Sequence, residues 1–146
     1  MALSKDDVSE VIAVYIKAWE TQDPDLITTI FTAAATYHER VMSDPIPDRA
    51  AIRQYWLTKV VDQQANITCR LLNLYLDGDT AVAEWEAEFD DVTQGVRKRM
   101  KEIAVLAFEG RRIASLREYW ASETIPVDAD VMMPGDWQDG AHAGHR

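Results

Sequence analysis

Cysteine is almost absent from this sequence, because Cys69 is the only one among 146 residues. A single thiol excludes an intrachain disulfide and a metal cluster built from several cysteines, and we expect Cys69 to pack as a small buried side chain. Long apolar runs are also lacking, since none reaches the roughly 20 residues that span a bilayer. Residues 1–6 contain no basic start followed by an apolar segment, so no secretory signal is expected. The sequence therefore predicts a cytoplasmic protein that is not embedded in a membrane.

Basic residues are scarce as well, with 15 Lys and Arg against 25 Asp and Glu and a formal net charge of −10. Proteins that bind nucleic acid or anionic lipid through electrostatics need a basic face. We therefore expect no nucleic-acid partner, and an acidic surface that keeps the protein in solution.

The length fits one domain with a substantial core. We expect residues 1–123 to form that domain and residues 124–146 to form an irregular C-terminal tail, which contains Pro126 and Pro134. In this tail His142 and His145 lack a fixed third ligand, so no metal site is expected. No glycine-rich phosphate loop is present either, and no cofactor is predicted.

The N-terminal third has the periodicity of helices. Ser4 and Asp7 form a capping-box pattern ahead of apolar residues at three- and four-residue spacing from Val8 to Trp19. Asp23-Pro24 predicts the end of this helix and the start of a short second one. Asp48 can cap a third helix, whose apolar side consists of Ile52, Tyr55, Trp56 and Val60.

The remainder has the alternation of strands. A short strand is predicted at residues 34–40, and longer ones at 67–76, 80–90, 96–108 and 113–122. Asp77-Gly78-Asp79 and Glu109-Gly110-Arg111-Arg112 are tight-turn signals between them. Helices followed by a run of hairpin-linked strands indicate an α+β fold with a mainly antiparallel sheet.

Several segments in this order resemble the nuclear-transport-factor-2-like superfamily, and within it the SnoaL-like domains. They are Tyr15-Ile16-Lys17-Ala18-Trp19, Asp23-Pro24-Asp25, Ile30-Phe31, Ala35-Thr36-Tyr37, Arg49-Ala50-Ala51-Ile52-Arg53, Phe108-Glu109-Gly110-Arg111-Arg112-Ile113 and Leu116-Arg117-Glu118-Tyr119-Trp120. The resemblance covers residues 5–123. It implies a cone-shaped barrel of curved, mixed, mainly antiparallel sheet, with three N-terminal helices enclosing a hydrophobic pocket. It also implies a homodimer formed through the outer face of the sheet.

The resemblance implies catalytic candidates. Tyr15 falls where the ketosteroid isomerases place a tyrosine that binds the substrate oxygen, and Glu39 falls where they place the acid that moves the proton. The position of their third residue, a protonated acid, is Ala104 here. Glu118 falls on one of the two acids that activate water in the limonene epoxide hydrolases, whereas the Arg and Asp partners have no match in Glu84-Trp85-Glu86-Ala87-Glu88.

Glu102 lies two residues before the isomerases' acid position and is the last acidic candidate. If Phe108 pairs with Ile113, simple alternation places Glu102 and Glu118 on opposite faces of the sheet. Both can enter the pocket only if a β-bulge intervenes. The structural alternative is that Glu39 lies in a solvated loop and that Glu102 and Glu118 form salt bridges with basic residues on adjacent strands.

Aromatic residues are the candidates for enclosing a small hydrophobic ligand, although packing alone also explains their spacing. The predicted substrate-binding residues are Trp19, Tyr37, Trp56, Trp85, Met100, Leu116 and Trp120. Fold does not select activity, so two hypotheses stay open. One is a cofactor-independent lyase, isomerase or hydrolase that uses a pocket carboxylate as general acid or base on a hydrophobic, oxygen-bearing substrate. The other is a non-catalytic ligand-binding or dimeric interaction module.

Overall fold

The computed structural model describes residues 2–126, and its first element is helix α1 (Lys5–Thr21). Ser4 caps this helix: its hydroxyl accepts a hydrogen bond from the Asp7 amide, and the Asp7 carboxylate accepts one from the Ser4 amide. The apolar stripe predicted from the sequence is the buried face of α1. The helix ends at Gln22, which adopts a left-handed conformation with φ of 56°.

Two more helices follow, each begun by an aspartate. Asp23 caps α2 (Pro24–Thr28) and Asp48 caps α3 (Arg49–Trp56), both by accepting hydrogen bonds from amides of the first turn. A π-helical turn, η1 (Leu57–Val61), continues α3 without a break. The three predicted helices are therefore present, and the third ends in a wider turn that the sequence did not signal.

Five strands form one sheet in the order β1-β5-β4-β3-β2. They are β1 (Phe31–His38), β2 (Gln64–Asp77), β3 (Thr80–Asp91), β4 (Val96–Glu109) and β5 (Arg112–Thr124). Strands β2 to β5 form an antiparallel meander, and β1 pairs with β5 in parallel. Gly78 and Gly110 turn the hairpins with φ of 63° and 61°, a conformation that glycine adopts without a steric penalty.

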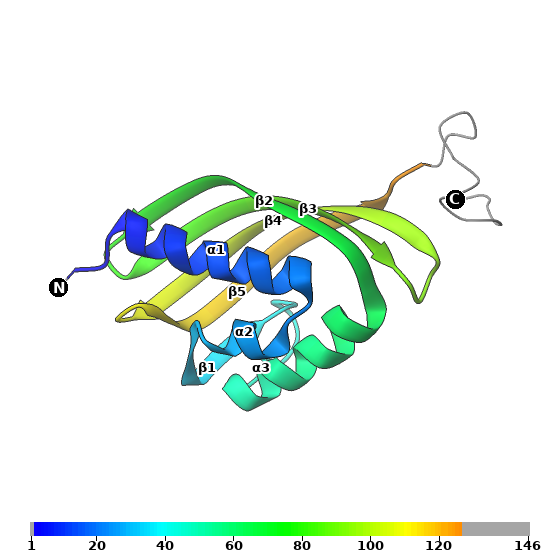
Figure 1. The fold of residues 1–146 in the computed structure, drawn as a ribbon. Coiled ribbons are helices and arrows are strands. Elements are labelled where there is room, and N and C mark those ends of the chain that lie inside the picture. The colour runs from blue at the N-terminus through cyan, green and yellow to red at the C-terminus, as the bar shows by residue number, and fades with distance from the viewer. Residues whose placement is uncertain (1, 127–146) are drawn as a thin grey trace.

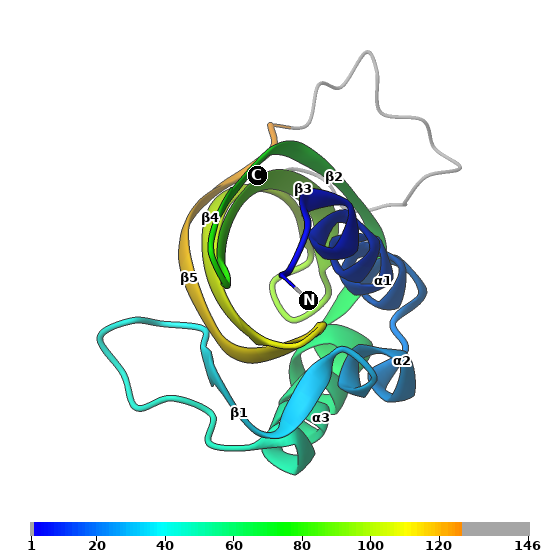
Figure 2. The same ribbon diagram turned by 90° about the vertical axis from the view of Figure 1, so that its left-hand side faces the viewer.

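The sheet curves strongly, and α1, α2 and α3 lie on its concave side (Figure 1). The view turned by 90° shows strands β2 to β5 as an arc, with α1 beside β2 and α3 next to β1 (Figure 2). The predicted α+β class and three-helix cone are confirmed. The predicted barrel is not closed, because the edge strands β1 and β2 do not pair with each other and the sheet stays open.

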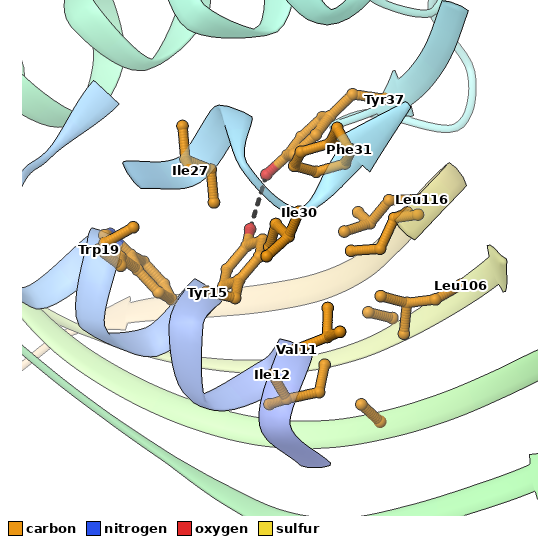
Figure 3. Packing of buried hydrophobic residues seen from close by; sticks show 14 of the residues in the cluster. Val11, Ile12, Tyr15, Trp19, Ile27, Ile30, Phe31, Tyr37, Leu106 and Leu116 are labelled. Carbon is orange, nitrogen blue, oxygen red and sulfur yellow. Dashed lines mark hydrogen bonds between the residues drawn. The ribbon is translucent and has the colours of Figure 1, made fainter. Parts of the chain in front are cut away.

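The core fills the space between the helices and the concave face of the sheet. Figure 3 shows Val11, Ile12 and Tyr15 of α1 directed toward Leu106 of β4 and Leu116 of β5. These side chains are at most 7% exposed. Burial of large apolar groups is the main stabilising term for such a domain, and here it fixes the helices against the sheet.

The β-bulge that the sequence left open is present between β4 and β5. Ala107 pairs with Ser115 but Phe108 pairs with Ile113, so Ala114 is an extra residue on β5. Beyond the bulge Ala104 lies opposite Glu118. The insertion of one residue reverses the facing of all of β5 that follows.

No helix within residues 2–126 is both long and apolar enough to cross a membrane. The predicted irregular tail lies outside the described residues except for Thr124 to Pro126, and His142 and His145 lie outside them entirely.

Candidate functional site

A cavity of about 170 Å³ opens between the helices and the sheet. Seven aromatic side chains border it: Tyr15, Trp19, Tyr37, Tyr55, Trp56, Phe89 and Trp120. Its acidic border residues are Glu39, Asp91, Glu102 and Glu118, and its basic ones are Arg40, Lys59 and Lys98. An aromatic enclosure with a few polar groups is typical of a small-molecule site.

Three residues from three different elements meet at the cavity wall. The Tyr37 hydroxyl lies 2.8 Å from Glu118 Oε2, and the Tyr15 hydroxyl lies 3.1 Å from the same oxygen. The two hydroxyl oxygens are 2.8 Å apart, a contact drawn in Figure 3. All three side chains are buried, so water does not compete for these hydrogen bonds.

This triangle of contacts suits a carboxyl group that gains and loses a proton. Two phenolic protons can fill only two of the three contacts when Glu118 is ionised, since each hydroxyl donates once. The two shorter contacts then form a chain in which Tyr15 donates to Tyr37 and Tyr37 donates to Glu118. A proton on Glu118 fills the third contact by donation to Tyr15, so both states are hydrogen-bonded.

Burial raises the pKa of Glu118 to about 7, although hydrogen bonds from Glu102, Tyr37 and Tyr15 oppose the rise. The group therefore titrates near neutral pH, where proton transfer to and from a substrate is most efficient. Burial raises the pKa values of Tyr15 and Tyr37 well above the usual value, and the charge of Glu118 adds to the effect. Both tyrosines therefore remain protonated donors.

Glu102 is the second buried carboxyl and is 4% exposed. Burial raises its pKa well above the ordinary value, and the charge of Glu118 and hydrogen bonding with Glu118 raise it further. Trp85 lies opposite Glu102 on β3, and its indole N–H lowers the pKa of Glu102 by a smaller amount. This N–H forms no hydrogen bond of good geometry among the described residues. Glu102 Oε2 likewise has no hydrogen-bond partner among the described residues. Glu102 is thus the carboxyl that keeps its proton when Glu118 ionises.

The bulge explains how both acids reach one cavity. Because Ala104 lies opposite Glu118, and Glu102 is two residues from Ala104, the two acids share the concave face of the sheet. The alternative of salt bridges does not apply to them, since neither acid has a basic group within 4.0 Å among residues 2–126.

Glu39 also borders the cavity, but in a different setting. Its carboxylate lies 3.5 Å from the guanidinium of Arg40, and its side chain is 20% exposed. Its carbonyl oxygen accepts a hydrogen bond of 2.9 Å from the Trp120 indole. A partly solvated, paired carboxylate is less suited to proton transfer than the buried pair, so the geometry favours Glu118 and Glu102.

Five of the seven predicted substrate-binding residues border the cavity, namely Trp19, Tyr37, Trp56, Met100 and Trp120. Trp85 and Leu116 do not border it. Both are fully buried, and Trp85 stacks on Tyr15 with ring centroids 5.0 Å apart. Trp85 and Leu116 belong to the packing behind the wall.

Tyr55, Lys59 and Gln64 also border the cavity, and none of them was predicted from the sequence to contact a ligand. Gln64 accepts a hydrogen bond of 2.8 Å from the Trp19 indole and so orients that ring. Tyr55 packs against Tyr37 with ring centroids 5.5 Å apart. Tyr55 adjoins Trp56 in the third helix, so the helical periodicity could have indicated that Tyr55 reaches the cavity. Gln64 is the first residue of β2, and no sequence pattern pointed to it.

Acidic residues on the outer face of β3 form ion pairs with arginines on both neighbouring strands. Glu88 lies 3.7 Å from Arg99 across the β3–β4 pair, and Glu86 lies 2.7 Å from Arg70 of β2. Among residues 2–126, no group of three or more His, Cys, Asp and Glu side chains is arranged to hold a metal ion.

Comparison with known proteins identifies the family. Residues 12–116 match the model of the SnoaL-like domain, and the chain belongs to this family. Its α+β cone is the fold of the nuclear-transport-factor-2-like superfamily. No curated protein sequence matches the chain.

Solved structures with the same fold include the epoxide hydrolase/cyclase-like enzyme SalBIII, which has a role in pyran ring formation in the polyether salinomycin. It is 24% identical with a TM-score of 0.72, over 84% of this chain and 98% of that one. A ketosteroid isomerase-like protein from Catenulispora acidiphila in complex with trimethylamine is 20% identical with a TM-score of 0.67, over 75% and 84%. A limonene-epoxide-hydrolase-like enzyme of M. tuberculosis is 13% identical with a TM-score of 0.66, over 80% and 84%. At these identities the likeness establishes the fold.

Proposed function

We propose that this protein is a cofactor-independent enzyme of the isomerase, lyase or hydrolase type, acting on a small hydrophobic molecule that carries oxygen. The observation that carries the proposal is the buried Glu118–Glu102 pair at an aromatic cavity. The two carboxyls have different surroundings, because Glu118 accepts from Tyr37 and contacts Tyr15, whereas Glu102 Oε2 has no hydrogen-bond partner among the described residues. Carboxyls whose pKa values are pushed apart can serve as the base and the acid of one reaction.

Opening of a strained cyclic ether by a hydroxyl group is the reaction that fits this pair best. Glu118 removes the proton of the attacking hydroxyl, a C–O bond forms, the ether C–O bond breaks, and Glu102 gives its proton to the leaving oxygen. Transfer of the proton from Glu118 to Glu102 then restores the starting state. No electron acceptor or further reactant is needed, and each carboxyl contributes on the order of 10²- to 10⁴-fold to the rate.

The structural relatives support this reaction class. SalBIII is described as epoxide hydrolase/cyclase-like and the M. tuberculosis protein as an epoxide hydrolase, and both share the fold. If the attacking hydroxyl belongs to the substrate the reaction is an isomerisation, and if it belongs to water the reaction is a hydrolysis.

The test uses a panel of small hydroxy-epoxides in ¹⁸O-labelled water at pH 7, with the products analysed by mass spectrometry. Cyclisation leaves the mass unchanged, whereas hydrolysis adds the mass of labelled water. We expect Glu118→Gln and Glu102→Gln each to lower kcat by about 10²-fold or more. Glu109→Gln, which changes an exposed acid at the end of β4, is the matched control. Retention of full activity by both Glu118→Gln and Glu102→Gln rules out the proposed acid–base pair.

A second candidate is the binding of a small organic amine without chemistry. Aromatic rings next to a carboxylate are the usual setting for an ammonium group, and Trp120 already has the Arg40 guanidinium 4.9 Å from its ring centroid. The complex of the Catenulispora acidiphila protein with trimethylamine shows that this fold accommodates such a ligand. Calorimetric titration with trimethylamine, and loss of binding in Glu118→Gln, would favour this candidate over the enzyme.

A further inference from the structure

Lys59 is the one basic residue bordering the cavity that lacks an acidic partner within the described part of the chain. Arg40 lies 3.5 Å from Glu39, and Lys98 lies 3.5 Å from Asp91. Lys59 borders the same cavity, is half-buried, and forms no ion pair or side-chain hydrogen bond among residues 2–126. In a chain with 25 acids and 15 bases, a half-buried cation without a partner calls for an explanation.

The local backbone places Lys59 at the cavity. It lies in η1, where the α-helical hydrogen-bonding pattern of α3 gives way to a π-helical turn. A π-turn contains one more residue than an α-turn and so redirects the side chains that follow, and such turns are frequent at functional sites. Within η1, both Lys59 and Val60 border the cavity.

The same wall has a second donor without an acceptor. Trp56, the last residue of α3, borders the cavity and is 2% exposed, and its indole Nε1 has no hydrogen-bond partner among the described residues. A buried N–H without an acceptor destabilises the folded protein. Two donors on the α3–η1 wall thus lack acceptors within the described part of the chain, whereas the carboxyl pair lies on β4 and β5.

We propose that Lys59 binds a carboxylate at one end of the ligand, so that the substrate class is a hydrophobic oxygenated carboxylic acid. The proposal rests on the proposed function, which concerns the reacting end of the substrate, and it adds the chemical group at the opposite end. A carboxylate fits better than a phosphate, because one ammonium group matches a single negative charge. A doubly charged group would also be repelled by the acidic protein and by Glu118. Lys59 is then a specificity residue, which holds the substrate without taking part in proton transfer.

The experiment compares cyclohexanecarboxylate with its neutral isostere cyclohexanecarboxamide at pH 8, with affinities from isothermal titration calorimetry. We expect the wild-type protein to bind the carboxylate about tenfold more tightly, the lower range for a charged hydrogen bond. Lys59→Met should abolish this preference and Lys59→Arg should retain it. Lys101→Met, which removes an exposed lysine of β4, is the matched control and should change nothing.

Two outcomes overturn the proposal: equal affinity of the wild-type protein for the two probes, or an unchanged preference in Lys59→Met. Trimethylamine tests the opposite charge: Lys59→Met should bind this cation more tightly than the wild-type protein does, because the variant lacks one positive charge at the cavity. Glu118→Gln separates this proposal from the proposed function: it should lower kcat by about 10²-fold or more and keep the preference for the carboxylate. Loss of the preference in Lys59→Met, with the preference kept in Lys59→Arg and in Glu118→Gln, would assign it to the charge of Lys59 and not to the acid–base pair.

Discussion

The raised pKa of Glu118 makes the stability of the protein depend on pH in a way that one substitution should remove. Its pKa is about 7 in the folded protein against 4.5 for an ordinary glutamate. Below pH 4.5 the carboxyl is protonated in both the folded and the unfolded chain. Between pH 4.5 and 7 the unfolded chain releases this proton while the folded protein retains it, so the free energy of unfolding falls as pH rises.

The size of this effect follows from the difference between the two pKa values. At about 1.4 kcal/mol per pKa unit, Glu118 lowers the free energy of unfolding by about 3 kcal/mol between pH 4.5 and pH 8. Glutamine has the same shape, stays neutral and still accepts the hydrogen bond of Tyr37. Glu118→Gln should therefore match the wild-type protein near pH 4.5 and exceed its stability at pH 8 by up to about 3 kcal/mol.

Urea denaturation at pH 4.5 and at pH 8, followed by tryptophan fluorescence, measures this difference. With a slope of about 2 kcal/mol per molar urea, the midpoint of Glu118→Gln at pH 8 should exceed that of the wild-type protein by about 1–2 M. Glu109→Gln, the exposed control, should follow the wild-type protein at both pH values. An equal midpoint difference at both pH values would refute the reasoning, because it would mean that Glu118 ionises as an ordinary exposed carboxyl.

Two further predictions concern the hydrogen-bonded triangle and the outer face of the sheet. Tyr37→Phe removes the shorter hydrogen bond to Glu118 and should shift the acidic limb of the pH profile of kcat/KM to higher pH by about one unit. An unshifted limb would mean that Tyr37 does not influence the pKa of Glu118. We also expect a homodimer through the outer face, where Ile103 and Tyr119 are cross-strand partners that are 37% and 47% exposed. Ile103→Arg should convert the dimer to a monomer in sedimentation velocity, and a wild-type monomer at micromolar concentration would remove this prediction.

Local signals in the sequence were sufficient for the secondary structure. The capping residues Ser4, Asp23 and Asp48 begin the three helices as predicted, because an N-cap depends on side chains within a few residues. The glycines of the hairpin turns are equally local. The short early strand is shifted, predicted at residues 34–40 and found at Phe31–His38, since its ends depend on pairing with the distant β5.

The candidate site was only partly predictable. Glu118, Glu102 and Tyr15 were named from the sequence, and Tyr37 was named as a ligand contact before its hydroxyl was known to lie 2.8 Å from Glu118. Lys59 carried no signal, because a lysine in a helical segment is normally solvated and only its place in η1 brings it to the cavity.

What the sequence by itself determined is therefore whatever depends on neighbours along the chain: the helices, the hairpins, the α+β class and the set of acids and aromatics available for a site. What the tertiary structure decided is which of them meet. The extra residue Ala114 turns the second half of β5 over, and this single insertion puts Glu118 on the same face as Glu102. Such a bulge has no reliable local pattern, because its position is set by the packing of both strands against the helices. The burial that raises the pKa values of the two acids likewise exists only once α1, β1 and the sheet enclose them.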